Sequence, residues 1–212
     1  MLMPKFICKK DIKFPGRGNK KGDNGKVLII GGSEDYVGAV ALAGLAALRT
    51  GCDWVTCACP KKVAWAINTL SPDLVSIKLK GNYISISHSK KLHELAKKHD
   101  AFLIGPGIGK RSGKIINSLI KNLNHIPKVI DADAIKMIRL QDTDNSIITP
   151  HRKEYSILLK NSKINDTTEL LKNNIIIKKA PVDEIISKYG LLYNKTGNPG
   201  MTKAGTGDVL AG

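Results

Sequence analysis

The chain ends on a segment whose residue types and spacing fit the binding of a phosphate group. Gly205 and Gly207 flank Thr206 and leave the backbone free to turn, so several N–H groups can converge on one anion. We call these three residues the anion loop. Asp208 follows at its mouth, where a carboxylate can accept a proton from a hydroxyl that is being phosphorylated, and the apolar run 209–211 predicts the first turn of a helix. An ordinary loop with Asp208 as helix N-cap is the alternative from these residues alone.

Other polar residues follow predicted strands. Asp131 and Asp133 stand two positions apart at a strand end, where both carboxylates can face a cleft or a metal ion and where turn or capping roles are equally expected. His151 opens a predicted helix and can contact a ligand through a ring nitrogen, although a solvated histidine is the more frequent case at a helix start. Read singly, these residues do not decide a function.

Two common phosphate-binding signatures are missing from the sequence. The glycines of 105–109 do not follow the Gly-x-Gly-x-x-Gly pattern, because Lys110 and Ser112 stand where the last glycine belongs. A Walker A loop is excluded because Gly25-Lys26 lacks the hydroxyl residue that would hold magnesium. Phosphate binding is therefore expected elsewhere, at the chain end.

Short apolar, β-branched segments alternate with amphipathic segments of helical length, which is typical of a parallel sheet covered by helices. The expected strands span 27–30, 54–58, 74–79, 101–104, 128–130, 146–148, 175–178 and 184–187. The expected helices span 39–49, 61–68, 90–98, 112–123, 134–138, 151–159 and 167–173, with Gly51 as a left-handed end to the first. Ligands of such sheets bind at the carboxyl ends of strands. Small and polar turns follow four of the strands and predict a cleft there: 31–33, 105–109, 131–133 and 149–151.

The composition excludes several classes of protein. Of the 212 residues, 42% are hydrophobic and 25% are charged, as in folded globular proteins and unlike disordered ones. The apolar runs are far shorter than the roughly 20 residues that span a bilayer, and no secretory signal is visible, so we expect a cytoplasmic protein with no membrane partner. The cysteines lack zinc-ligand spacing and are expected to be reduced core residues, two of them on one face of a strand. They are Cys8, Cys52 and the strand pair Cys57 and Cys59.

The net charge of +16 favours an anionic partner. The lysines are scattered and aromatic residues make up 5% of the chain, so a nucleic-acid face is not indicated. A lysine-rich solvated surface explains the charge at least as well.

Taken in order, these segments resemble the ADP- or ATP-dependent NAD(P)H-hydrate dehydratases, a branch of the ribokinase-like kinases. The resemblance implies a three-layer α/β fold of ribokinase type in one domain over 1–212, with a central, mostly parallel sheet covered by helices. It also implies phosphorylation of the ring hydroxyl of the S-epimer of hydrated NADH or NADPH, followed by loss of phosphate and return of the reduced cofactor. The matching segments are 21–23, 25–33, 36–39, 105–109, 129–134, 149–151 with Glu154, 198–201 and 205–212.

The resemblance also implies roles for individual residues. Asp208 would be the catalytic base, and the backbone of Gly205, Thr206 and Gly207 would bind the transferred phosphoryl group. Magnesium would neutralise the phosphates of ADP or ATP, and no residue is assigned as its ligand. Asp208 and three further residues match positions that contact the hydrate: Ala39, Gly107 and His151. The residues that match positions near the adenine nucleotide are Gly207, Lys178, Lys179, Ala180, Pro181 and Val182.

The chain departs from the family pattern at three places. Lys179 stands where the family has a glycine after its lysine, so a loop on the nucleotide side is changed. Arg152-Lys153 stands between His151 and the following glutamate in place of Pro-Gly, and Lys203-Ala204 replaces small residues before the anion loop.

Gly212 is the last residue, one helical turn beyond the anion loop, where family members continue with further helices. We therefore expect a C-terminally short domain that forms a homo-oligomer, with the companion epimerase on a separate chain. Three alternatives stay open: a ribokinase-like kinase for a vitamin precursor, an inactive nucleotide-binding module and a polyanion-binding protein. The segments 149–151 and 198–201 favour the dehydratase over the kinase.

Overall fold

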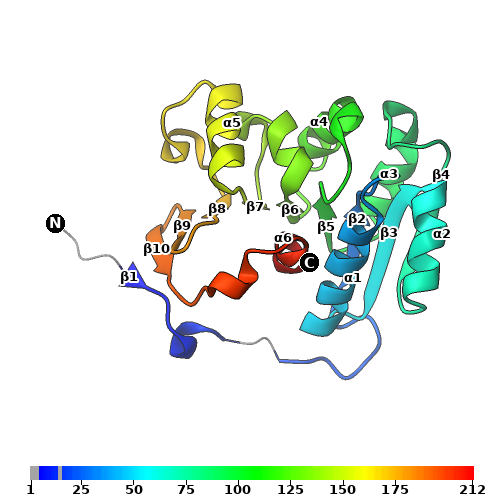
Figure 1. Ribbon diagram of the computed structural model, residues 1–212, viewed down its shortest axis with the longest axis horizontal. Helices are drawn as coiled ribbons and strands as arrows, with labels where there is room; N and C mark the ends of the chain where they lie inside the picture. Colours follow the sequence, from blue (N-terminus) through cyan, green and yellow to red (C-terminus); the bar gives the residue numbers. More distant parts are fainter. Residues whose placement is uncertain (1–4, 14–15) are drawn as a thin grey trace.

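The computed structural model describes residues 5–13 and 16–212, and in this part of the chain ten strands form one sheet in the order β1-β10-β9-β8-β7-β6-β5-β2-β3-β4 (Figure 1). Neighbours from β4 through β2 to β8 are parallel, β9 is antiparallel to both neighbours, and β1 is parallel to β10. The expected mostly parallel sheet is confirmed. The strands are β1 (Lys5–Phe6), β2 (Lys26–Ile30), β3 (Trp54–Pro60), β4 (Val75–Leu79), β5 (Ala101–Ile104), β6 (Lys128–Ile130), β7 (Ser146–Ile148), β8 (Ile175–Lys178), β9 (Asp183–Ser187) and β10 (Gly190–Asn194).

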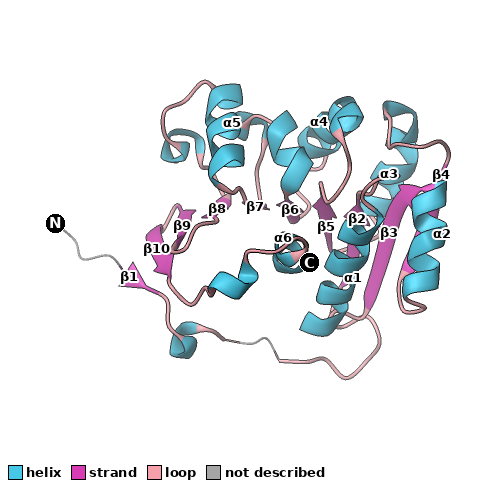
Figure 2. Ribbon diagram, in the orientation of Figure 1, coloured by secondary structure: helices cyan, strands magenta, loops and turns pink. Residues whose placement is uncertain are grey.

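Helices cover both faces of the sheet (Figure 2). α1, α2 and α6 share one apolar cluster with the sheet, and α3, α4 and α5 share the other. Within the described ranges, no helix is long and apolar enough to cross a bilayer. The helices are α1 (Val37–Thr50), α2 (Lys61–Leu70), α3 (Ser89–Ala96), α4 (Gly113–Asn122), α5 (Arg152–Ser162) and α6 (Thr206–Ala211). The 3-10 helices are η1 (Lys9–Asp11), η2 (Ile86–His88), η3 (Lys110–Ser112), η4 (Ala132–Met137), η5 (Leu140–Asp142), η6 (Thr167–Leu170) and η7 (Pro199–Met201).

The direction of the chain across the sheet reverses between β2 and β5, which are neighbours. β3 and β4 follow on one side of β2, while β5 to β8 follow on the other. The connection after β2 runs through α1 on one face, and the connection after β5 runs through α4 on the opposite face. Such a reversal opens a crevice at the carboxyl ends of the two strands, where α/β proteins bind ligands.

α1 packs close to the sheet because several side chains on its buried face are small. Ala43 and Ala47 are buried, and a Cβ on Gly44 would lie 2.8 Å from Leu74 Cδ2. The helix ends at Gly51 with φ of 110°, the left-handed conformation that was expected. This close packing lets α1 reach α6, which lies beside it in Figure 1.

Each expected strand and helix corresponds to an observed element, and two expected helices differ in type. The segments predicted at 134–138 and 167–173 are the 3-10 helices η4 and η6. β1 and β10 were not predicted: β10 carries no β-branched residue and forms by pairing with β9 across a tight turn.

The cysteines are free and the two in β3 are buried, as predicted. Cys8 contradicts the prediction of a core position. It is exposed near the start of the chain, where its Sγ lies 2.9 Å from Asp11 Oδ2 in η1.

Gly105, directly after β5, holds two loops of the carboxyl edge at backbone distance. Its φ is 127°, a conformation that side chains disfavour, and a Cβ there would overlap the backbone oxygen of Asp131 after β6. Gly109, four residues later, also has a positive φ of 77° but has open space around it. The two glycines therefore differ in steric surroundings more than in backbone strain.

We expect Gly105→Ala to lower the free energy of unfolding by more than about 3 kcal/mol, because strain and backbone overlap add. Gly109→Ala should cost less, about 1–3 kcal/mol, because its φ of 77° and ψ of 157° strain a side chain while nothing lies within 4 Å of the added Cβ. Urea unfolding of both variants measures the difference. Equal losses for the two variants would contradict the close approach of the β5 and β6 loops.

Candidate active site

The anion loop lies at the start of α6, which begins at Thr206 and not at Val209 as predicted. Gly205 has φ of 92°, and a Cβ there would lie 2.7 Å from Leu42 Cδ1 of α1, so this position requires glycine. The Thr206 hydroxyl lies 2.9 Å from Met201 O and 3.0 Å from Lys203 O, so it fastens the loop to the preceding segment. The first-turn N–H groups of α6 have no partner inside the helix and are available to an anion.

Asp208 is the third residue of α6 and is half-buried. Burial raises the pKa of its carboxyl group above the ordinary value, the nearby charge of Asp131 raises it further, and Lys179 opposes the rise. A raised pKa makes the carboxylate a better proton acceptor. Asp208 thus has the environment of a general base.

Asp131 stands at the end of β6 with a side chain that is 3% exposed. The Thr149 hydroxyl, after β7, donates to Asp131 Oδ1 at 2.6 Å, and Lys179 Nζ, after β8, donates to the same oxygen at 3.0 Å. A buried charge needs such partners to offset its lost hydration. Three neighbouring strand ends therefore meet at this one carboxylate.

Asp133 faces a different group from Asp131. Its Oδ1 accepts from Lys136 Nζ at 2.9 Å, and its Oδ2 accepts from Gly109 N at 3.2 Å. Lys136 also lies 3.8 Å from the buried Glu154, so one ammonium group joins these two carboxylates. Residues 5–13 and 16–212 contain no cluster of three or more acidic, histidine or cysteine side chains that could hold a metal ion.

His151 is the N-cap of α5. Its Nδ1 accepts from the backbone N–H groups of Lys153 at 3.1 Å and Glu154 at 3.4 Å, while Glu154 Oε2 accepts from His151 N at 3.1 Å. Arg152-Lys153 therefore leaves this capping arrangement intact. Because Nδ1 is an acceptor, the neutral ring carries its proton on Nε2, which lies 3.4 Å from Glu154 Oε1.

Ala39 and Gly107 are brought together where α1 meets the loop after β5. A Cβ on Gly107 would lie 3.4 Å from Ala39 Cβ and 2.6 Å from Tyr36 Cβ. Leu42, three residues after Ala39 and on the same side of α1, touches Gly205 of the anion loop. α1 thus links Ala39 and Gly107 to the anion loop, whereas His151 lies apart at the start of α5.

The residues predicted for nucleotide binding separate into two groups. Lys179 points to Asp131 and lies near Gly207, whose added Cβ would be 3.6 Å from Lys179 Nζ. The others form the end of β8 and the turn to β9. Lys178 Nζ donates to Glu184 Oε1 at 2.9 Å, Ala180 N donates to Asp183 Oδ1 at 3.0 Å, and Val182 is 41% exposed; Pro181 lies between them.

Three residues of this site were not among the predicted contacts: Thr149, Lys136 and Glu154. Thr149 and Glu154 belong to segments that match the family pattern, and this match could have identified them as site residues from the sequence. Lys136 had no such signal, because its role depends on the 3-10 geometry of η4, which places its ammonium beside Asp133 three residues earlier.

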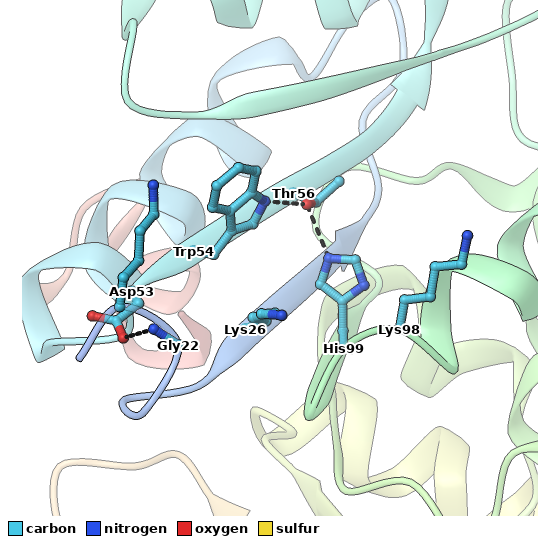
Figure 3. A pocket seen from close by; sticks show the side chains of 8 residues that line it. Gly22, Lys26, Asp53, Trp54, Thr56, Lys98 and His99 are labelled. Carbon is cyan, nitrogen blue, oxygen red and sulfur yellow. Dashed lines mark hydrogen bonds between the residues drawn. The ribbon is translucent and has the colours of Figure 1, made fainter. Parts of the chain in front are cut away.

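A separate hollow of about 390 Å³ lies at the opposite, amino end of β2, β3 and β5 (Figure 3). The Trp54 indole N–H donates to Thr56 Oγ1 at 3.2 Å, and Thr56 in turn lies 2.9 Å from His99 Nε2. His99 Nδ1 contacts Leu95 O at 2.7 Å. These polar groups satisfy one another, and the hollow contains none of the residues predicted for chemistry.

Comparisons with known proteins identify the family of the chain. A model of the NAD(P)H-hydrate dehydratase family matches residues 27–212. The bifunctional NAD(P)H-hydrate repair enzyme Nnr of Methanothermobacter thermautotrophicus is 39% identical over 95% of this chain and 43% of its own length. The ADP-dependent (S)-NAD(P)H-hydrate dehydratase of Cenarchaeum symbiosum is 35% identical over 92% of this chain and 73% of its own length. The chain thus spans about two fifths of the bifunctional relatives it matches.

Solved structures share the fold. A ribokinase-like superfamily protein from Enterococcus faecalis has a TM-score of 0.81 at 22% identity, over 98% of this chain and 77% of that one. The ADP/ATP-dependent NAD(P)H-hydrate dehydratase from Bacillus subtilis, co-crystallized with ATP/Mg2+, has a TM-score of 0.78 at 22% identity, over 100% of this chain and 79% of that one. The predicted ribokinase-like fold is therefore confirmed.

The raised pKa of Asp208 can be measured without any substrate. We expect its side-chain carboxyl carbon to titrate, by NMR, above the value of about 3.9 for a free aspartate. Asp131→Asn should move the midpoint to lower pH, because it removes a negative charge that disfavours the carboxylate. Asp133→Asn is the matched control and should move it little, because Asp131 and Lys179 are the charges that act on the pKa of Asp208. A midpoint that ignores Asp131→Asn would contradict the described site.

Proposed function

We propose, because this chain belongs to the NAD(P)H-hydrate dehydratase family, that it repairs hydrated NADH or NADPH by nucleotide-dependent dehydration of the S-epimer. The observation that carries the proposal is Asp208, half-buried beside Asp131 and Lys179 and directly after a loop that offers backbone N–H groups to an anion. The ADP-dependent relative supports ADP as a donor, and the dehydratase crystallized with ATP/Mg2+ supports ATP.

The proposed reaction starts with the ring hydroxyl of the hydrate near Asp208. Asp208 accepts the hydroxyl proton while the oxygen attacks the terminal phosphorus of the nucleotide. The leaving group is ADP when ATP is the donor and AMP when ADP is the donor. The backbone N–H groups of Gly205, Thr206 and Gly207 stabilise the charge on the transferred phosphoryl group. Phosphate then departs with the electron pair of the ring C–O bond, the neighbouring ring carbon loses a proton, and the double bond of NADH or NADPH is restored.

The surrounding residues would hold the two ligands. Ala39, which is partly exposed beside Gly107, would contact the ring of the hydrate, and His151 can offer its Nε2 proton. The turn 178–182 would contact the nucleotide. The excess of lysine over acidic residues favours the approach of two polyanions.

Magnesium fits the donor set as an ion that arrives with the nucleotide. Mg²⁺ is usually held by substrate phosphates and one or two carboxylates, so a three-residue cluster is not required. Asp133, whose side chain is partly exposed, is the carboxylate that would hold it, whereas Glu154 is buried in the cap of α5. When bound, it would neutralise charge on the phosphates.

The cellular setting is part of the proposal. Free cysteines fit a reducing compartment such as the cytoplasm.

Exposed apolar side chains on α6 and α1, among them Val209, Leu210 and Leu42, support self-association, which light scattering would test. We propose that the epimerase acts as a separate partner; addition of an epimerase to an R,S mixture should then raise recovery from partial to complete.

The direct test mixes the purified chain with the hydrate of NADPH, magnesium and either ADP or ATP, and follows the return of the reduced-nicotinamide absorbance. Recovery with at least one nucleotide is expected. Phosphorylation of a vitamin precursor without recovery would favour the kinase, nucleotide binding without turnover would favour an inactive module, and salt-sensitive DNA binding would favour a polyanion-binding protein.

Asp208→Asn should lower the recovery rate by about 10² to 10⁴-fold, because it removes the base and keeps the side-chain shape. ATP should still raise the melting temperature of the variant. Asp73→Asn, on an exposed turn before β4, is the control and should keep the parental rate. Parental activity in Asp208→Asn would exclude Asp208 as the base.

A further inference from the structure

Lys179 is fixed at the rim by its backbone. Its N–H donates to Pro150 O at 2.8 Å, and it forms a parallel bridge with His151 that extends the pairing of β7 and β8 by one step. Its side chain is 23% exposed and ends on the buried Asp131. The ammonium group is therefore held by the sheet on one side and by an ion pair on the other.

The two consecutive lysines at the end of β8 point in different directions, as successive residues of a strand do. Lys178 pairs with Glu184 on β9, and its Nζ lies 5.2 Å from the ring centre of Tyr155 on α5. Lys179 points to the opposite side, toward Asp131 and Gly207. Only the second lysine, which stands where the family pattern has glycine, thus brings a charge to the anion loop.

The ammonium group lies at the place where phosphate charge would gather. A Cβ added to Gly207 would lie 3.6 Å from Lys179 Nζ, and Asp208 is the next residue in the chain. The buried carboxylate of Asp131, 3.0 Å from Lys179 Nζ, holds the lysine side chain in this orientation before any ligand binds. A positive charge that is positioned in advance stabilises charge in a transition state without reorganisation.

We propose that Lys179 is a phosphoryl-binding residue of this site, which contacts the terminal phosphoryl group of the bound nucleotide and keeps that contact during transfer to the hydroxyl. The part of this inference that concerns phosphoryl transfer rests on the proposed function. The part that concerns contact with the nucleotide requires only that the chain binds the nucleotide. Lys179 takes no part in the proton transfer of this proposal, so the proton and the leaving group follow the path already given. Where the family pattern has a glycine with a freely rotating backbone, this chain has the positively charged side chain of Lys179 in a fixed position.

The same charge acts on Asp208. Asp131 raises the pKa of Asp208 and Lys179 lowers it, while α1, which packs on α6, has no titratable side chain between residues 37 and 48. Loss of the Lys179 charge should therefore raise the pKa of Asp208. Because the base must be ionised, the acid limb of kcat/KM should then move to higher pH.

The test compares Lys179→Met, which keeps the aliphatic stem, with Lys179→Arg, which keeps the charge. Lys188→Met is the control for net charge. Lys188 directly follows β9, whose end lies beside the start of β8, whereas Lys179 follows the end of β8. Thermal melting shows whether each variant is folded. The measurements are calorimetric binding of ATP with magnesium and without hydrate, and kcat/KM for recovery as a function of pH.

In Lys179→Met we expect ATP to bind at least about tenfold more weakly, kcat to fall at least about tenfold, and the acid limb to move to higher pH. Lys179→Arg should restore binding and the position of the limb, and Lys188→Met should match the parent. Unchanged ATP affinity in a folded Lys179→Met, or equal losses in Lys188→Met, would overturn the proposal. Should the parent bind ATP but show no recovery, the proposed function fails while the binding comparison still decides Lys179.

Discussion

A nearly buried carboxylate at the end of β6 is the group on which the rest of this site depends. Burial of Asp131 removes most of its hydration, so the fold must supply partners, and it does so with a hydroxyl after β7 and an ammonium after β8. The backbone oxygen of the same residue lies against Gly105 after β5. Four neighbouring strand ends are thereby held at one edge, and the charge of Asp131 in turn raises the pKa of Asp208.

The reversal of strand order explains why these groups meet beside a crevice. β2 and β5 are adjacent, but α1 and α4 leave them toward opposite faces, so the loops 31–33 and 105–109 can face an open space at the carboxyl edge. α1 lies against Gly107 through Ala39 and against Gly205 through Leu42. Ala39, Gly107 and the anion loop are thus parts of one arrangement built around α1.

Much of this fold was predictable from hydrophobic periodicity, because parallel strands are buried on both faces and read as short apolar runs such as 27–30 and 101–104. The position of the site followed from the rule that ligands bind at the carboxyl edge. The pairing of Asp131 with Lys179 did not follow, because the residues are 48 positions apart and the direction of Lys179 depends on where β8 ends. The start of α6 at Thr206 was also missed, since glycine and threonine have low helix propensity and the contact with α1 outweighs it.

Attack of the hydrate's own oxygen on phosphorus is the central chemical step, and an isotope label tests it most directly. NADPH hydrate carrying ¹⁸O in its ring hydroxyl is turned over with ATP, and the released inorganic phosphate is analysed by mass spectrometry. Transfer to that hydroxyl followed by C–O cleavage predicts one ¹⁸O atom in each phosphate released by turnover. Unlabelled phosphate, with the ¹⁸O found in water, would contradict the assignment of Asp208 as the base that activates the hydroxyl for phosphoryl transfer.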